Sequence, residues 1–411
     1  MVRIKILSGY NSIGGNFIRI EDDDRTLIFD QGIRFDAMAR YYSWLISPIG
    51  LAELRELGVL PKAEWYRDAD AVYITHMHLD HLGALSNIPS EISVHLPSLT
   101  SYMDIEEKWK NSPTWLSLIP RRYYIELKEL KPLKTDENEV TAIPVSHSAH
   151  PSYALLYYGS DQTILYTGDF RVESFLNKEE FEKLREGEDL LTYIGENPDI
   201  KVDTLIIEGT NIGADRTPLL PRDALEIIKR IVFTYRPIIA TLHMLDLEYA
   251  YALLKLAEEL GLECLLISPW MVKMIEKIPK PETELKVIEE YIDFPTLLEK
   301  TSIEDIEKES IILTPHRGAV DFLRDLKRRG VIEENPVAIL SEPELEREEP
   351  MEYDIVANWF SRLGVQHYRI RVSGHYYPYQ LKEIIQTIKP KKIEPIHTLK
   401  PELMYIISKT I

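Results

Sequence analysis

One short stretch, residues 75–81, constrains this chain of 411 residues more than any other part of it. It places three imidazoles and one carboxylate within six positions. A single histidine is more often an ordinary core or surface residue, but His76, His78, Asp80 and His81 together have the density and spacing of metal ligands. A strand-like run precedes them and a helix-like run follows, so the stretch is predicted to be a strand-to-helix loop. There, His76 and His78 can face one tetrahedral site while Asp80 and His81 turn toward a second, which predicts two metal ions.

Three later residues are candidates to complete these sites, and each follows a strand-like segment. His147 is the candidate third imidazole of the first site. Asp169 directly follows a glycine that allows close backbone approach, and a carboxylate there can bridge two cations. His397 would complete the second site. Asp30 also ends a strand, and two interpretations stay open for it: a hydrogen-bond partner that fixes one tautomer of a ligand imidazole, or a turn-capping residue.

Length and composition describe a folded protein with two domains. A hydrophobic content of 45% and a charged content of 28% are those of an ordinary globular chain, and 411 residues exceed what one core usually serves. No run reaches the roughly 18 apolar residues of a membrane span, and the N-terminus lacks the apolar core of a signal peptide. We therefore expect a cytoplasmic protein with no membrane partner. The single Cys264 lies in an apolar run, where a buried structural thiol is expected rather than a nucleophile.

The net charge of −19 limits non-specific attraction to nucleic acid, which depends on neutralising phosphates. The net charge is only a weak argument against a nucleic-acid partner, because bound dications would offset the charge of the site carboxylates. Local basic groups, such as Arg369, Arg371 and the lysines of 389–392, can also contact phosphates. The alternative interpretation of these groups is a solvated surface.

The middle of the chain alternates strand-like and helix-like segments. Strands are predicted at 237–241, 264–267, 311–314 and 337–340, and a helix at 247–260, whose apolar residues form one stripe. Alternating strands and helices predict a parallel sheet. The charged segment 181–199 is predicted to be a surface excursion.

In order and context, Asp30, the cluster at 76–81, His147, Asp169 and His397 resemble the motif series of the metallo-β-lactamase superfamily. Three further segments resemble the additional motifs of its β-CASP nuclease branch, to which the RNase J family belongs: 205–210 (Leu-Ile-Ile-Glu-Gly-Thr), 372–375 (Val-Ser-Gly-His) and 395–398 (Pro-Ile-His-Thr). This resemblance implies an α/β protein with an αββα metallo-β-lactamase fold and an inserted β-CASP α/β domain. The implied divisions are 1–210 and 368–411 for the two parts of the metallo-β-lactamase domain and 211–367 for the insertion. The chain ends 14 residues after His397, where RNase J proteins typically carry a further domain, so homo-oligomer formation is left open.

The resemblance also implies roles for individual residues. It implies two zinc ions, with manganese as the alternative, held by seven ligands: His76, His78, Asp80, His81, His147, Asp169 and His397. Asp80 is also expected to be catalytic, because it would orient the metal-activated hydroxide. Glu208 would keep His375 charged, so that His375 can donate a proton to the leaving oxygen. Ser373 and Gly374 would offer a hydroxyl and a backbone donor to a substrate phosphate.

The favoured function is a dinuclear-metal ribonuclease of the RNase J kind that hydrolyses single-stranded RNA as a 5′–3′ exonuclease, with endonuclease activity as a further option. Three alternatives stay open: a nuclease acting on DNA, a small-molecule lactonase or phosphodiesterase of the same superfamily, and a non-catalytic RNA-binding paralogue. Filled ligand positions argue against the last of these. A large insertion argues against a small substrate, which needs no such cap.

Overall fold

The computed structural model describes residues 1–411 except 24, 44, 121–123, 215–217, 236, 307–308, 331–335, 342–352 and 410–411. The chain packs as two compact units. The first consists of Met1–Val172, Lys178–Thr217 and Gly374–Ile411, and the second of Glu173–Asn177 and Pro218–Ser373. Apart from the short segment 173–177, the second unit begins seven residues and ends six residues later than the predicted insertion 211–367.

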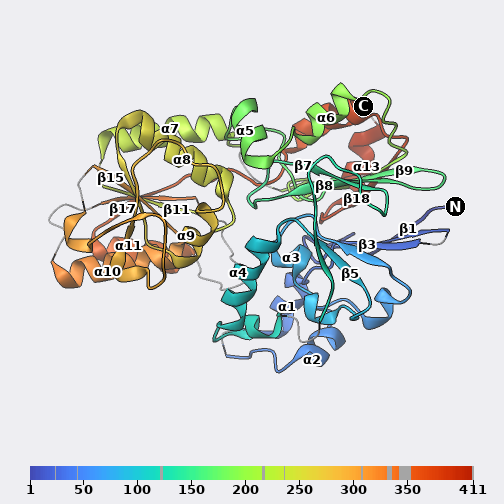
Figure 1. The fold of residues 1–411 in the computed structure, drawn as a ribbon, viewed down its shortest axis with the longest axis horizontal. Coiled ribbons are helices and arrows are strands. Elements are labelled where there is room, and N and C mark those ends of the chain that lie inside the picture. The colour runs from blue at the N-terminus through green and yellow to red at the C-terminus, as the bar shows by residue number, and fades with distance from the viewer. Residues whose placement is uncertain are drawn as a thin grey trace. The chain divides into compact units, whose positions relative to one another are not determined.

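Two sheets form the centre of the first unit (Figure 1). The first sheet runs in chain order: β1 (Arg3–Ser8), β2 (Phe17–Asp22), β3 (Arg25–Phe29), β4 (Ala71–Tyr73), β5 (Ser93–Leu96) and β6 (Leu127–Glu129). The second sheet has the order β18 (Lys392–Ile396), β10 (Thr204–Glu208), β9 (Thr163–Tyr166), β8 (Tyr153–Tyr158) and β7 (Val140–Pro144). Phe29 and Tyr73 of one sheet share a buried cluster with Leu155 and Tyr166 of the other, so the main core lies between the sheets.

Helices cover the outer faces of both sheets, which confirms the predicted mixed α/β class (Figure 1). The second sheet packs its other face against α6 (Leu190–Glu196), α12 (Leu381–Ile388) and α13 (Pro401–Lys409). Strand β8 is buried on both faces, because Leu155 points into the inter-sheet core and Leu156 toward these helices. The first sheet is accompanied by α1 (Phe35–Tyr41), α2 (Leu51–Glu56), α3 (Leu79–Leu82) and α4 (Leu99–Lys110). Short 3-10 helices complete the unit: η1 (Ala63–Tyr66), η2 (Leu85–Asn87), η3 (Trp115–Leu118) and η6 (Pro378–Gln380).

The prediction that 181–199 is a surface excursion is wrong. The segment contains the end of α5 (Lys178–Arg185) and all of α6, and it buries Phe181, Leu184, Leu190 and Ile194. These apolar residues recur at helical spacing, so one face of each helix is apolar although the average composition of the segment is charged.

The second unit is built on one parallel sheet of seven strands, as the alternating pattern predicts. Its order is β14 (Glu299–Thr301), β13 (Leu285–Ile288), β12 (Glu263–Leu266), β15 (Ser310–Thr314), β11 (Ile238–Thr241), β16 (Val337–Leu340) and β17 (Gln366–Arg369). The helices are α7 (Pro221–Thr234), α8 (Leu247–Leu260), α9 (Pro269–Ile275), α10 (His316–Arg329) and α11 (Tyr353–Leu363), with η4 (Glu289–Tyr291) and η5 (Ile303–Asp305).

Helix α8 coincides with the prediction at both ends. The Asp246 side chain accepts a hydrogen bond from the Tyr249 amide at its start, and Gly261 adopts a left-handed conformation at its end. Cys264 is buried in β12, and burial raises the pKa of its thiol to about 12, which confirms a structural thiol. Within the described residues, no helix combines the length and apolar character needed to cross a bilayer.

Candidate metal centre

Strand ends of both sheets in the first unit supply the candidate ligands. The cluster lies between β4 and α3 as predicted, but the helix begins earlier than expected, so His76 and His78 lie in the loop and Asp80 and His81 lie in α3. Strands β9, β10 and β18 are parallel, and β7 and β9 are each antiparallel to β8. The carboxyl ends of β7, β9, β10 and β18 therefore meet at one edge, where His147, Asp169, Glu208 and His397 lie.

Close backbone packing fixes the short helix α3, which carries Asp80 and His81. The amide of Gln31 donates to the carbonyl of His81 at 2.8 Å, and that of Ile33 to Leu79 at 3.0 Å. A Cβ atom on Gly32 would lie only 1.5 Å from the carbonyl oxygen of Asp80. Glycine is therefore required at position 32 for this approach.

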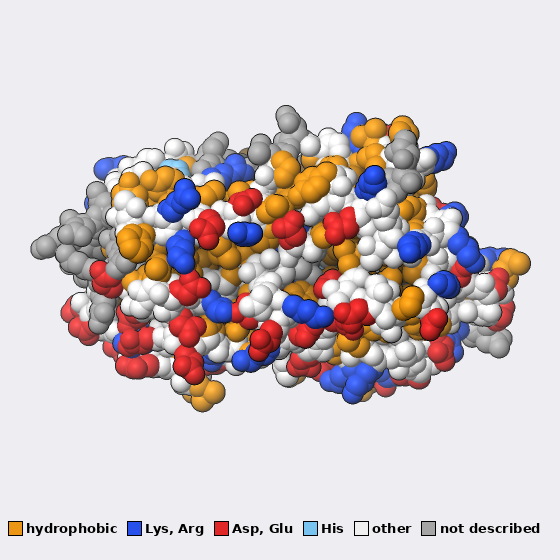
Figure 2. All heavy atoms as spheres, turned by 90° about the horizontal axis from the view of Figure 1, so that it is seen from above, with side chains coloured by type: hydrophobic (Ala, Val, Ile, Leu, Met, Phe, Trp, Pro, Cys, Tyr) orange, Lys and Arg blue, Asp and Glu red, His pale blue; other side chains and the backbone are white. Residues whose placement is uncertain are grey.

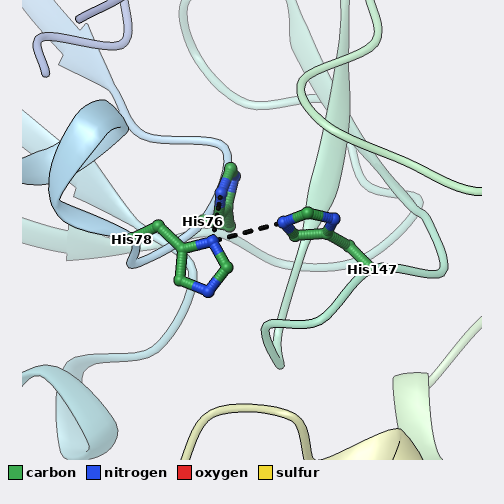
Figure 3. A group of neighbouring side chains, drawn as sticks. All are labelled: His76, His78 and His147. Atoms are coloured by element: carbon green, nitrogen blue, oxygen red, sulfur yellow. Dashed lines mark hydrogen bonds between the residues drawn. The ribbon is translucent and has the colours of Figure 1, made fainter. Parts of the chain in front are cut away.

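Three imidazoles converge in a first group, His76, His78 and His147 (Figure 3). The Nδ1 atom of His78 lies 3.2 Å from Nε2 of His76 and 3.3 Å from Nε2 of His147. His76 and His147 are buried and His78 is partly exposed. Three ring nitrogens aimed at one point are the donor set of a transition-metal site such as zinc.

A second group contains Asp80, His81, Asp169 and His397. Nε2 of His397 lies 3.3 Å from Oδ2 of Asp80 and 3.6 Å from Oδ2 of Asp169, and Nε2 of His81 lies 3.1 Å from the same Asp169 oxygen. That oxygen is also 4.0 Å from Nε2 of His76, so Asp169 lies between the two groups. The other oxygen, Oδ1, is buried and finds no hydrogen-bond partner among the described residues. A bound cation would satisfy it, so the residues present fit a metal.

Oxygen atoms hold the Nδ1 nitrogen of every imidazole that offers Nε2 to the site. The pairs are His81 with Asp30 Oδ2 at 2.7 Å, His147 with the Gly374 carbonyl at 2.6 Å, His397 with Thr210 Oγ1 at 2.8 Å and His76 with Thr75 Oγ1 at 3.1 Å. An acceptor at Nδ1 favours the tautomer whose Nε2 lone pair is free for a metal. Asp30 thus lies where its predicted tautomer-fixing role requires.

Sequence reasoning missed Thr75 and Thr210. Thr75 immediately precedes the cluster, and Thr210 closes the segment 205–210, so hydroxyl residues flanking ligand motifs were the available signal. Gly374 uses its carbonyl to hold His147, whereas the sequence suggested only a backbone donor. Ser373 is the last residue of the second unit and is buried, and its contact with a phosphate stays a prediction.

The protein groups alone favour the protonation states that metal ligands need at His76, His147, Asp80 and Asp169, but not at His81. Burial, followed by the neighbouring imidazoles, holds the pKa values of His76 and His147 well below 6.5. Burial opposes ionisation of Asp80 and Asp169, but the surrounding imidazoles outweigh it and lower both pKa values. Burial likewise opposes charge on His81, while the carboxylates of Asp169 and Asp30 raise its pKa. The site is therefore preset with two carboxylates and at least two neutral imidazoles.

Glu208 and His375 form a separate pair beside the second group. Nδ1 of His375 lies 3.0 Å from Oε1 of the fully buried Glu208, whose Oε2 accepts from the Thr210 amide at 2.8 Å. Burial lowers the pKa of His375, but the carboxylates of Glu208, Asp169 and Asp80 together outweigh burial, and the net shift is upward. The Asn211 side chain donates to the carbonyl oxygens of His375 and Tyr376 at 3.2 and 3.0 Å and so holds this loop. His375 also lies within ligand distance of Asp169 and His397, which leaves metal ligation as a competing role.

This fold and donor set define the class of protein. Residues 13–196 match the family described as "Metallo-beta-lactamase superfamily". This part of the chain is therefore a metallo-β-lactamase domain, and the chain is distantly similar to proteins named Ribonuclease J.

Curated relatives share limited sequence identity with the chain. It is 21% identical to Ribonuclease J of Pyrococcus abyssi over 289 residues, which cover 66% of this chain and 60% of that protein. Identity with Ribonuclease J of Methanocaldococcus jannaschii is 24% over 179 residues, covering 42% and 40% of the two chains. For Ribonuclease J of Mycobacterium tuberculosis it is 27% over 177 residues, covering 42% and 28%. The chain thus spans 60% or less of each of these relatives.

A solved structure shares the whole fold. It is a crystal structure of a protein of unknown function from Enterococcus faecalis V583, with a TM-score of 0.71, 18% identity, and coverage of 98% of this chain and 95% of that one. At this identity the likeness establishes the fold alone.

Proposed function

We propose that this protein is a dinuclear-metal nuclease that hydrolyses phosphodiester bonds of single-stranded RNA. The observation that carries the proposal is the position of Asp169 between two ligand groups, with the Glu208–His375 pair beside them. The relatives named Ribonuclease J support RNA as the substrate.

Each group of residues has a distinct task in this proposal. His76, His78 and His147 would hold one ion, Asp80, His81 and His397 the other, and Asp169 would contact both. Two divalent ions, zinc with manganese as the alternative, would neutralise phosphate charge and activate a water. Glu208 holds Nδ1 of His375 and raises its pKa, so the ring keeps a proton that its other nitrogen donates to the leaving oxygen.

The surface charge bears on how RNA would be held. On the face in Figure 2, the described Lys and Arg side chains are interspersed with Asp and Glu instead of forming one basic patch. With a net charge of −19, general attraction to a polyanion is weak, and the metal centre would contribute much of the affinity for the scissile phosphate. Binding of RNA is therefore expected to weaken strongly when the metals are removed.

The test uses end-labelled single-stranded RNA and DNA of one sequence, each with a 5′-monophosphate, a 5′-triphosphate or a circular backbone. We expect 5′–3′ degradation of the monophosphorylated RNA, little degradation of the other two RNA forms, and complete loss with chelator. The Asp80→Ala variant, purified identically, controls for contaminating nuclease. Cleavage of circular RNA would assign endonuclease activity, and preference for the DNA series would assign a DNA substrate.

Two results would contradict the proposal. Hydrolysis of bis-p-nitrophenyl phosphate without cleavage of any oligonucleotide would indicate a small-molecule phosphodiesterase. Well under two equivalents of bound metal, with no activity gained on adding zinc or manganese, would indicate a non-catalytic RNA-binding protein.

A further inference from the structure

A chain of hydrogen-bonded side chains runs from the second ligand group into the core between the sheets. His81 contacts Asp30 through Nδ1 at 2.7 Å and faces Asp169 through Nε2 at 3.1 Å. Asp30 Oδ2 also accepts a hydrogen bond from the Tyr166 hydroxyl at 2.7 Å, and that hydroxyl accepts one from Asn16 Nδ2 at 2.9 Å. Asn16, Asp30, His81 and Tyr166 have no exposed surface, so water does not compete for these bonds.

Donor and acceptor chemistry gives this chain a single direction. The Asn16 amide nitrogen can only donate, so the Tyr166 oxygen accepts and its one proton points to Asp30. The Asp30 carboxylate can only accept, so His81 must donate from Nδ1. The Nε2 lone pair of His81 then faces the position between His81 and Asp169. Burial raises the pKa of the Tyr166 hydroxyl well above its usual value, in agreement with a phenol that keeps its proton.

We propose that Tyr166, oriented by Asn16, is a positioning residue for the second metal and acts through Asp30 and His81. Asp30 Oδ2 contacts His81 and Tyr166 at 2.7 Å each and accepts from the Thr75 hydroxyl at 2.9 Å, while Oδ1 accepts from the Thr75 amide at 2.8 Å. Thr75 still holds the carboxylate when the Tyr166 hydroxyl is lost, but Oδ2 then lacks one of its two shortest contacts, which weakens the positioning of the His81 imidazole. The inference rests on the proposed metal centre, and it adds Tyr166, a residue that would not itself contact a metal ion.

The test is a zinc titration of the whole chain in competition with a chromophoric chelator. Loss of an outer partner of a metal ligand typically lowers affinity by about 10–100-fold. We expect Tyr166→Phe to lower the affinity for the second zinc by about tenfold and Asp30→Asn by about 100-fold, with the first zinc unchanged. In an Asp30→Asn background, Tyr166→Phe should cause no further loss, because its effect passes through Asp30.

Tyr157→Phe is a matched control. The Tyr157 hydroxyl donates at 2.7 Å to Oδ2 of the buried Asp22, and its ring lies in the same inter-sheet core. The Tyr157→Phe substitution therefore removes an equivalent hydrogen bond far from any candidate ligand. We expect it to lower resistance to urea as much as Tyr166→Phe does while leaving both zinc affinities unchanged.

The outcomes separate the two levels of inference. Fewer than two zinc ions bound to the natural chain would overturn the metal centre and this inference together. Two tight sites in the natural chain, with second-site affinity unchanged or increased in Tyr166→Phe, would overturn this inference alone. Equal losses of zinc affinity in Tyr166→Phe and Tyr157→Phe would also overturn it, because the effect would then be general to the core. If Tyr166→Phe does not fold, Asn16→Leu removes the donor to Tyr166, and it should weaken the second site severalfold.

Discussion

Replacing Thr210 by valine should weaken the second metal site without touching a ligand. Thr210 lies two residues beyond the end of β10, and its Oγ1 is 2.8 Å from Nδ1 of His397. Valine keeps the branched shape of the side chain and the backbone amide that donates to Glu208 at 2.8 Å. The substitution therefore removes one acceptor from one ligand imidazole.

The expected magnitude follows from what Nδ1 of His397 loses. A net hydrogen bond contributes about 0.5–1.5 kcal/mol, and leaving the buried Nδ1–H group without its partner costs about 1–3 kcal/mol. Removal of an outer partner of a ligand histidine typically costs about 10–100-fold in metal affinity. Because the Thr210 hydroxyl is neutral, the loss should lie at the lower end, about tenfold or 1.4 kcal/mol.

The assay is chelator competition for zinc, combined with turnover on labelled RNA at increasing zinc. We expect Thr210→Val to regain nearly full turnover at saturating zinc, because the ligands and the Glu208–His375 pair are intact. Thr204→Val, at the start of β10, is the control, since buried Thr204 Oγ1 donates to Gln162 Oε1 at 3.0 Å and contacts no candidate ligand. The reasoning is refuted if the two variants lose zinc affinity equally, or if Thr210→Val binds zinc as the natural chain does.

Three further predictions concern the reaction and the stability of the first unit. His375→Ala should slow cleavage by about 10²–10⁴-fold, the usual contribution of a general acid, with two metals still bound; metal loss measured by elemental analysis would instead identify His375 as a ligand. Asp80→Ala should weaken the second metal site and lower turnover by several orders of magnitude, while RNA binding measured at saturating zinc, with both ions bound, is largely kept; near-normal turnover would contradict its assignment. Burial opposes ionisation of Asp22, but hydrogen bonds from Ser160 and Tyr157 outweigh it and lower its pKa. Its stabilising contribution is therefore present above the unfolded pKa of about 3.9 and lost as pH falls through the lower folded value. The difference in unfolding free energy between the natural chain and Asp22→Asn should shrink below about pH 4, as followed by urea denaturation, and a constant difference would contradict this assignment.

The convergence of the candidate ligands could be predicted from sequence because their chemistry is local. Four of them lie within six positions, and the others directly follow strands, so residue type and spacing were sufficient. The residues that orient them could not be predicted in this way. Thr210 meets His397 across 187 positions, and Tyr166 meets Asp30 across 136. Threonine and tyrosine have many ordinary roles, and only the fold shows which hydroxyl meets which imidazole.

Secondary structure, too, could be predicted where its signals are local in the sequence. Helix α8 has local signals at both ends, Asp246 as its N-cap and Gly261 after its last turn, and its predicted bounds are correct. Helix α5 was missed because charged residues dominate its sequence, and α6 was missed because its apolar face is short. Burial of Leu190 and Ile194 against the second sheet, which is a tertiary contact, stabilises α6.

The origin of the ligands gives the proposed metals a structural role as well as a chemical one. His76, His78, Asp80 and His81 follow a strand of the first sheet, whereas His147, Asp169 and His397 follow strands of the second. Each candidate ion would therefore draw ligands from both sheets. Because a metal that binds only the folded chain adds its binding free energy to folding, occupied sites would cross-link the sandwich at the edge where the ligands meet. Hydrogen exchange of the amides that follow β4, β9 and β18 should accordingly be the part of the first unit that slows most on zinc binding.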